Sequence, residues 1–530
     1  MNARIWILVL AAVTVAAGAA VADSTSVWEG NLRLGGVVKD ETGDPSLMQE
    51  TFNIYEGFTV TSVYLKGRFD PRNHLRLDLS DINRDNRQGR FEYRRTGVAR
   101  LFSRYDESRF IFDPAGAAEA SRRDWWSTLS LTPSKYLWVS GDYNLQTRRG
   151  DRVGYPAGTA SALGVAYDTD LNRWRVEAQG RTDSYGGATI AYDGVSLSDQ
   201  LNPLQERKGY VVSANVHVRG VFIDRLTHVV RGSIGRNELE TSGLGYDLKT
   251  IQYTGIVDAM RALRLQYRFY GSRVEDEALN NRTDRYIHDA DAVVRAGRVA
   301  TISAGYGWEA WDDNRSLTTY DNLRASLTLR EPGDRVSGRL AWSARNKEDK
   351  EDLTLLRDTE YARYEARIDA RPVAALSIGG RFAERTRSMP DIDAEASGMV
   401  ASAYGRYRFD GAGGGMLTST TLGVDYRYAD DDYDNRVAAY RAKSHFVTGR
   451  VDADLFEDLS AGAAVTYMDI GEDLDIEKSV LSFHLGYRFL HGYDVDVKYN
   501  AYNFDDYMVA GRFYTANVVW INLGYTFTPD

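Results

Sequence analysis

Apolar and polar residues alternate one by one along most of this 530-residue chain. In Tyr210–Arg219, one set of alternate positions reads Tyr, Val, Ala, Val, Val, and the other reads Val, Ser, Asn, His, Arg. In Tyr361–Arg371, charged residues likewise alternate with Tyr, Ala, Ile and Ala. Because successive side chains of a strand point to opposite faces, this period predicts strands with one apolar and one polar face. We therefore expect an all-β protein.

The same alternation recurs in further segments, which are Ala262–Ser272, Arg335–Arg345, Val447–Leu455, Tyr493–Tyr499 and Arg512–Phe527. Short turns separate such strands at Asp70–Asn73, Thr132–Lys135, Glu331–Asp334, Arg371–Ala374, Gly411–Gly415, Glu457–Asp458 and His491–Gly492. Longer polar segments lie between these turns, at Arg148–Thr159, Ser184–Lys208, Glu275–Arg285, Arg345–Thr359, Glu384–Ser397 and Ala429–Tyr440. This layout predicts a large closed antiparallel transmembrane β-barrel of about 24 to 26 strands, with short periplasmic turns and longer external loops.

The N-terminus reads as a secretory signal. Arg4 supplies the basic residue, Ile5–Ala20 is an apolar core, and Ala20-Val21-Ala22 is a cleavage site before Asp23. The apolar run is short for a membrane-spanning helix, which needs about 20 residues. We expect residues 1–22 to be the signal peptide and residues 23–530 to be one outer-membrane barrel, since no linker marks a second domain.

Composition agrees with this prediction. After the signal, no apolar run is long enough for a membrane helix, and the mean hydropathy is −0.43. A barrel remains compatible, because only every second residue of its strands faces lipid. Aromatic residues make up 12% of the chain, which fits the aromatic girdles of barrels, and a large soluble β-protein can also be rich in Tyr. Cysteine is absent, so this chain has neither a disulfide nor a covalent c-type haem attachment.

The last predicted strand, Arg512–Phe527, resembles the C-terminal assembly signal of bacterial outer-membrane barrels. Its apolar face contains Leu523, Tyr525 and Phe527, and Trp520 lies on the other face. The resemblance implies recognition by the barrel-assembly machinery through these residues. An ordinary edge strand of a soluble β-protein is the alternative interpretation.

The charged residues of the alternating segments are expected to face the lumen, because a mid-membrane Arg or Lys facing lipid costs ~2–4 kcal/mol. These candidates are Arg264, Arg268, Arg335, Arg339, Arg363, Glu365, Arg367, Asp369, Arg450, Asp452, Asp454, Asp494, Asp496 and Lys498. A lumen of this width cannot be filled by side chains, so it must hold water, a plug or another protein. A solvated wall with compensating charges explains the mixture; a wall that docks a protein is the second hypothesis.

No catalytic, cofactor-binding or metal-binding constellation is found, and we expect no enzyme activity. The acidic run Asp430–Asn435 lacks the spacing of a calcium loop and is expected to be a solvated external loop. The formal net charge of −10 and the lack of basic patches with stacking aromatics argue against nucleic-acid binding.

Several stretches are similar to the MtrB/PioB family of outer-membrane barrels. They are Gly30–Gly36, Tyr55–Phe58, Leu101–Asp106 with Phe110–Pro114, and Ile302–Glu309 with Thr318–Asn322 and Pro332. The chain is shorter than typical members and lacks the N-terminal cysteine pair of some of them. The resemblance implies a sheath around a multihaem c-type cytochrome, so that haem is present through a bound partner.

Two function classes follow for a protein of the bacterial outer membrane, surrounded by lipid and lipopolysaccharide. One is a structural sheath that holds a haem protein across the membrane. The other is a porin with a water-filled lumen, which requires a loop that narrows the channel. The predicted loop Ser184–Lys208 is the candidate for that constriction.

Overall fold

The computed structural model describes residues 27–44, 47, 54–82, 84–111, 119–151, 166–182, 185–220, 225–313, 316–349, 358–410, 418–434, 439–490, 492–509 and 511–528. The predicted signal peptide at residues 1–22 and the predicted turn Gly411–Gly415 lie outside these ranges. No helix among the described residues is both long and apolar enough to cross a membrane.

The described chain consists of 26 strands and two short 3-10 helices, η2 (Pro203–Gln205) and η3 (Pro390–Ile392). The strands are β1 Val27–Gly43, β2 Gly57–Asp70, β3 Asn73–Ser80, β4 Gln88–Arg95, β5 Ala99–Ile111, β6 Glu119–Ser134, β7 Leu137–Asp151, β8 Ala166–Arg181, β9 Gly186–Asp199, β10 Arg207–Arg219, β11 Leu226–Leu239, β12 Gly245–Asp258, β13 Leu263–Asp276, β14 Asn281–Ala296, β15 Ala300–Asp312, β16 Leu317–Arg330, β17 Val336–Asp349, β18 Thr359–Val373, β19 Leu376–Met389, β20 Ala394–Asp410, β21 Ser419–Asp434, β22 Ala439–Asp454, β23 Leu459–Glu472, β24 Ile476–Leu490, β25 Tyr493–Asp506 and β26 Phe513–Phe527.

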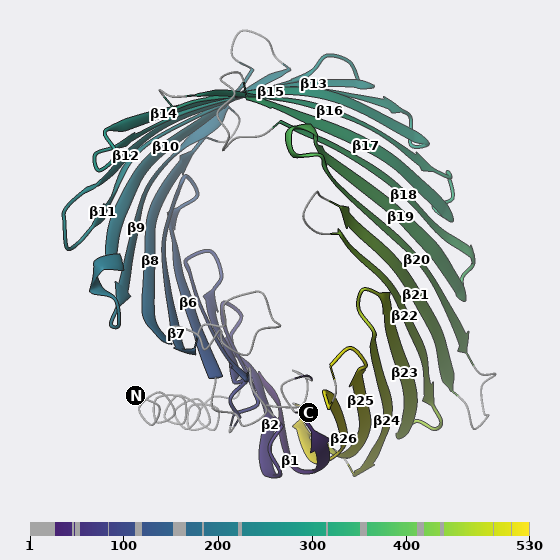
Figure 1. The fold of residues 1–530 in the computed structure, drawn as a ribbon. Coiled ribbons are helices and arrows are strands. Elements are labelled where there is room, and N and C mark those ends of the chain that lie inside the picture. The colour runs from purple at the N-terminus through teal and green to yellow at the C-terminus, as the bar shows by residue number, and fades with distance from the viewer. Residues whose placement is uncertain are drawn as a thin grey trace.

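These strands form one closed ring (Figure 1). Each strand pairs antiparallel with the next in sequence, and β1 pairs with β26 over Gly30–Gly43 and Tyr514–Phe527. Closure leaves no unpaired sheet edge, which is the condition for a β-structure in lipid. The predicted all-β closed antiparallel barrel is confirmed, and the strand number is at the upper end of the predicted range.

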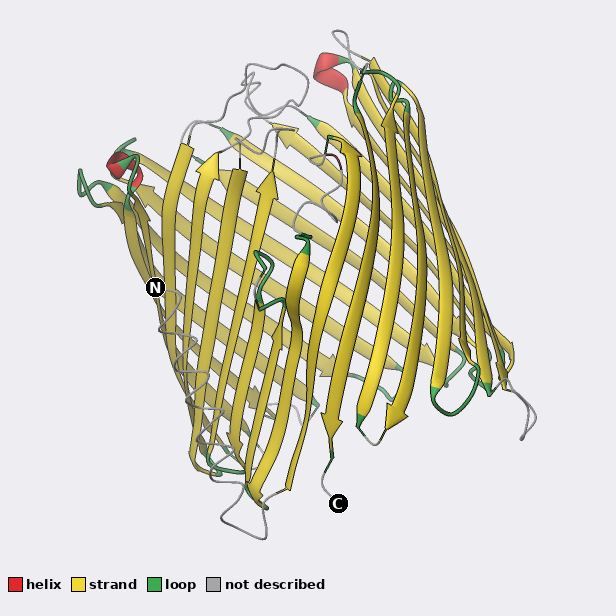
Figure 2. Cartoon of the chain, turned by 90° about the horizontal axis from the view of Figure 1, so that it is seen from below, coloured by secondary structure: helices red, strands yellow, loops and turns green. Residues whose placement is uncertain are grey.

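Short turns and longer connections lie on opposite rims, as predicted, but the predicted long segments are too wide. Residues 71–72, 135–136 and 374–375 connect strands at one rim, and residues 44–56 and 200–206 at the other. The C-terminus lies at one rim and the 3-10 helices at the other (Figure 2). All six predicted long segments contain strand residues, and Ser184–Lys208 contains the whole of β9. Likewise, Asp430–Asp434 lies at the end of β21 and not in a loop. The polar strand ends were mistaken for loops because they carry charged side chains on both faces.

A belt of exposed apolar side chains covers one face of the ring. On neighbouring strands β11 and β12, Ile234 is 60% exposed and Ile251 is 52% exposed. On β17 and β18, Leu340 and Ile368 are 57% and 55% exposed. A continuous apolar surface of this extent is stable against lipid rather than water. It is therefore the outer face of a transmembrane barrel.

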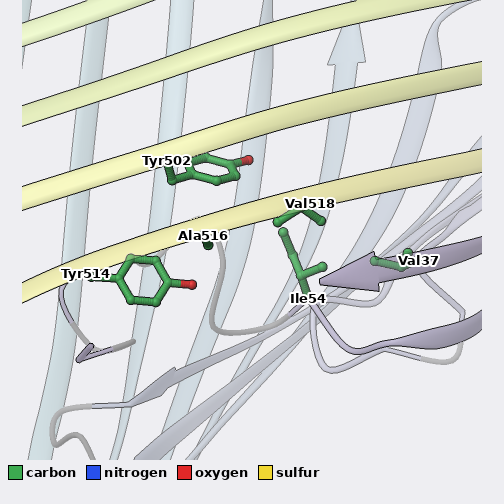
Figure 3. Close-up of a cluster of buried hydrophobic side chains, with 6 residues drawn as sticks. All are labelled: Val37, Ile54, Tyr502, Tyr514, Ala516 and Val518. Carbon is green, nitrogen blue, oxygen red and sulfur yellow. The ribbon is translucent and has the colours of Figure 1, made fainter. Parts of the chain in front are cut away.

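The opposite face is buried where the ring closes. Val37 of β1, Tyr502 of β25 and Tyr514, Ala516 and Val518 of β26 form a hydrophobic cluster with Ile54 (Figure 3). Ile54 lies in the connection between β1 and β2, so this connection folds back over the β1–β26 seam.

Strands β3 and β4 are shorter than their neighbours, with 8 residues each. Near the ends of these short strands, polar contacts join the β1–β2 and β3–β4 connections to β5. Tyr55 donates a hydrogen bond to Asp85 (2.7 Å), and Arg109 of β5 contacts Asp85 (3.1 Å) and Tyr55. Burial and the neighbouring Asp85 carboxylate raise the pKa of Tyr55 to about 12, so its hydroxyl stays a donor at neutral pH.

Replacing Tyr514 tests the contribution of the seam cluster. Its side chain is 0% exposed, and its hydroxyl donates to Glu41 (2.8 Å). We expect Tyr514→Ala to destabilise the barrel by about 3–5 kcal/mol, because it leaves a cavity at the closure. The matched variant Tyr514→Phe keeps the ring and should cost about 1 kcal/mol. Denaturant unfolding in detergent measures both values; equal losses would contradict the cavity explanation.

Candidate functional site: the polar wall

The sheet face opposite the apolar belt carries most charged strand residues; we call it the polar wall. The alternation along the strands and the ladder register assign the predicted lumen residues to this wall. They lie on β13 (Arg264, Arg268), β17 (Arg339), β18 (Arg363, Glu365, Arg367, Asp369), β22 (Arg450, Asp452, Asp454) and β25 (Asp494, Asp496, Lys498). Arg335 lies in the connection just before β17.

Many charges on the polar wall are paired with a charge two residues along the same strand. Arg367 contacts Asp369 (2.7 Å), Arg363 contacts Glu365 (3.1 Å), and Arg450 contacts Asp452 (2.8 Å). Residues two apart share a face of a strand, so this spacing makes such pairs geometrically natural. Since their side chains are partly exposed and screened by solvent, such pairs contribute little to stability.

One ion pair crosses the closure of the ring. Arg33 of β1 reaches Asp494 of β25 at 2.9 Å, across the intervening strand β26. Gly524 stands between them in the register, opposite both residues. A Cβ at Gly524 would lie 2.4 Å from an Asp494 oxygen. The absence of a side chain at Gly524 therefore provides the space that this ion pair occupies.

A second cluster surrounds Glu309 of β15, which is 4% exposed. Arg285 of β14 and Arg345 of β17 contact its carboxylate at 2.7 and 3.3 Å. The indole of Trp311 also donates to the same carboxylate. The guanidinium of Arg285 stacks over Trp311 at 4.8 Å, and that of Arg345 stacks over Tyr320 at 4.3 Å.

Sequence reasoning missed this cluster. Glu309, Arg285 and Arg345 come from three strands, and the register between those strands brings them together. The available signal was the spacing Glu309-Ala-Trp311, which places both side chains on one strand face. A lone Trp-Glu pair is too common to have singled out the site.

The acidic run proposed as an external loop takes part in ion pairs at the end of β21. Asp430 contacts Arg441 of β22 at 3.4 Å, and Asp431 contacts Arg385 of β19 at 3.0 Å. Within the described ranges, no group of three or more His, Cys, Asp or Glu residues could hold a metal ion.

The closing strand β26 presents the two faces expected of it. Leu523, Tyr525 and Phe527 belong to the exposed apolar belt, at 49%, 41% and 36% exposure. Trp520 lies on the opposite face, packs against the seam cluster, and has the Lys498 ammonium 5.4 Å from its ring centroid. Recognition of these residues by the barrel-assembly machinery stays a prediction.

Comparison with known proteins shows that this chain resembles solved structures in its fold. No protein-family model matches the chain, and no curated protein matches it in sequence. The structure is similar to the FrpB iron transporter from Neisseria meningitidis in its F5-1 variant, with a TM-score of 0.52 and 9% identity over 94% of this chain and 82% of that chain. The F3-3 variant gives a TM-score of 0.51 and 8% identity, covering 94% and 81% of the two chains.

The chain is an outer-membrane β-barrel. The closed 26-strand ring, the apolar belt and the likeness in barrel fold agree on this point. At 8–9% identity the likeness shows the fold, and the iron transport named for the FrpB proteins is a property of those proteins. The predicted localisation in the outer membrane of a Gram-negative cell is confirmed.

The Glu309 cluster yields a prediction for stability. Glu309→Gln removes the charge that two arginines share, and should destabilise the barrel by about 2–3 kcal/mol. This is below the 3–5 kcal/mol for a fully buried pair, because the arginine side chains are 36% and 45% exposed. Glu365→Gln, on the same wall but with a 24% exposed side chain, is the control and should cost about 1 kcal/mol. Thermal unfolding followed by circular dichroism compares them; an equal shift for both variants would contradict the role of burial.

Proposed function

We propose that this barrel is a sheath that holds a protein partner in its lumen, and that the partner is a multihaem c-type cytochrome. The polar wall lines the lumen in this proposal, since the apolar belt faces lipid. The proposal extends the resemblance to MtrB/PioB barrels, and three features of the molecule support it.

The first feature is width. A barrel of 8 strands is just wide enough for side chains to fill, and the diameter grows roughly linearly with strand number. A ring of 26 strands therefore encloses far more space than its own side chains occupy. The connection that folds back at Ile54 covers the β1–β26 seam, which is a small part of the wall.

The second feature carries the most weight. The segment expected to narrow a porin channel, Ser184–Lys208, is instead built into the wall as β9, paired with β8 and β10. Gly186–Asp199 is held in two ladders and cannot cross the lumen, and residues 200–206 are the short connection with η2 at the rim (Figure 2). The candidate constriction of the porin hypothesis is therefore mostly wall, which supports the sheath, because a sheath needs an unobstructed lumen.

The third feature is the apolar content of the polar wall. Trp126 of β6 and Phe446 of β22 lie on this face and are 44% and 37% exposed. Exposed aromatic rings among charges are typical of protein interfaces, where such residues supply contact area. In a water-filled channel the same rings would remain in contact with solvent at a cost.

In this function, the residues of the barrel insulate the partner from lipid and orient it in the lumen. The strands separate the partner from lipid, and the charges of the polar wall fix its position. Electron transfer would be carried by the haem groups of the partner.

Co-purification tests the proposal. The barrel is extracted from its native outer membrane in mild detergent, and the absorbance of the fraction that contains it is recorded. We expect a haem Soret band at a fixed ratio to the barrel protein through successive columns, because a partner enclosed in the lumen dissociates slowly. As a control, the barrel refolded alone should be colourless and should conduct ions in a planar bilayer. A native fraction that is colourless and conducts equally well would overturn the sheath and favour the porin.

A further inference from the structure

The polar wall is strongly basic over three neighbouring strands, although the whole chain carries a formal charge of −10. On this face of β17, β18 and β19, the basic residues are Arg339, Arg345, Lys347, Arg363, Arg367, Arg371, Arg381, Arg385 and Arg387. The acidic residues on the same face are Asp349, Glu365 and Asp369. This face of the three strands therefore carries nine basic residues and three acidic ones.

Three of these arginines stand side by side. In the ladder register, Arg339 of β17 is opposite Arg367 of β18, and Arg367 is opposite Arg381 of β19. Adjacent strands lie about 4.8 Å apart, so this arginine row spans about 10 Å across the wall. A second rung, with Arg363 opposite Arg385, lies four residues along β18.

The nearby carboxylates do not neutralise the row. Asp369 accepts hydrogen bonds from Arg367 (2.7 Å) and from the Tyr404 hydroxyl (2.9 Å). Glu365 is shared between Arg363 (3.1 Å) and Arg381 (3.3 Å). Among the described residues, no ion pair involves Arg339.

The row has no structural explanation in the barrel itself. Like charges directly opposite one another on neighbouring strands destabilise a sheet, and here the arrangement occurs on two consecutive pairings. The side chains of Arg367 and Arg381 are 58% and 49% exposed, so their free N–H groups are open to a ligand. Guanidinium groups bind carboxylates in a bidentate manner, and a row of them fits several carboxylates at once.

We propose that the arginine row, Arg339, Arg367 and Arg381, binds carboxylate groups on an acidic face of the protein held in the lumen. This inference rests on the proposed sheath function and names the chemistry of the docking surface. The charge complementarity selects the orientation of the partner, because the row lies on one side of the ring, among β17 to β19 (Figure 1).

The test uses the full-length barrel refolded in detergent and a short fluorescein-labelled oligo-glutamate as the probe. Fluorescence anisotropy measures binding to the wild-type barrel and to the triple variant Arg339→Gln, Arg367→Gln, Arg381→Gln. We expect the triple variant to bind at least about tenfold more weakly, and wild-type binding to weaken as salt is raised.

A matched control removes the same charge elsewhere on the wall. Arg175 of β8, Arg324 of β16 and Arg450 of β22 each contact carboxylates on the wall, which are Glu177 and Asp193, Asp289 and Asp291, and Asp452. In the ladder register none of the three is opposite another arginine. Changing these three arginines to glutamine should alter the affinity by less than about twofold. Equal weakening by both triple variants, or no binding by the wild type, would overturn the proposal.

A third variant addresses geometry and folding. Arg339→Lys, Arg367→Lys and Arg381→Lys keep the charge and lose the planar fork, so an intermediate affinity is expected. Thermal unfolding should show that the glutamine row variant is at least as stable as the wild type, since like-charge pairs are removed. A large loss of stability would mean that the row serves the fold, and would overturn its assignment as a binding site.

The outcome separates this inference from the sheath function. If the native barrel carries haem but the row does not bind oligo-glutamate, the sheath stands and the arginine row fails. If the row binds oligo-glutamate while the native barrel lacks haem, the carboxylate site stands and its occupant is not a cytochrome.

Discussion

Backbone hydrogen bonding in lipid is the constraint on which this structure depends. A strand in the membrane has no water for its N–H and C=O groups, so each strand needs two neighbours. The pairing of β1 with β26 supplies the last pair of neighbours and removes both sheet edges. Residues with special roles gather at this seam: Gly524 admits the Arg33–Asp494 pair, and Tyr514 and Ile54 bury its inner side.

In the closed ring, alternate residues of each strand face lipid on one side and the lumen on the other, so the two faces differ in chemistry. One face must be apolar because it meets lipid. The other face is free to carry charge. Most of this freedom is used for paired arginines and carboxylates, as at Arg450 and Asp452, which give a polar but locally neutral surface. The β17–β19 region has an excess of basic residues. The polar wall is therefore more positively charged on that side of the ring.

The sequence predicted the fold closely because alternation is a local property of each strand. The short turns between the strands then predict antiparallel order, and an apolar face in lipid requires closure. Loop positions were predicted less well, since charged strand ends such as Asp430–Asp434 resemble loops in composition. The arginine row and the Glu309 cluster were not found, although Arg339 and Arg367 were both named. Their proximity depends on register between strands, which the lengths of the connections set and no local pattern reveals.

The β1–β26 pairing also dictates an order of events during synthesis and export. The two strands that must meet are separated by nearly the whole chain. Their contacts therefore have the largest sequence separation in the barrel, and contacts of large separation form slowly. Until Phe527 has been delivered, the remaining strands can at most form an open sheet with two adhesive edges. Such an intermediate would aggregate if released, so the growing sheet has to be held until its two ends meet. Closure of this 26-strand ring is thus a late step, because it requires both β1 and β26.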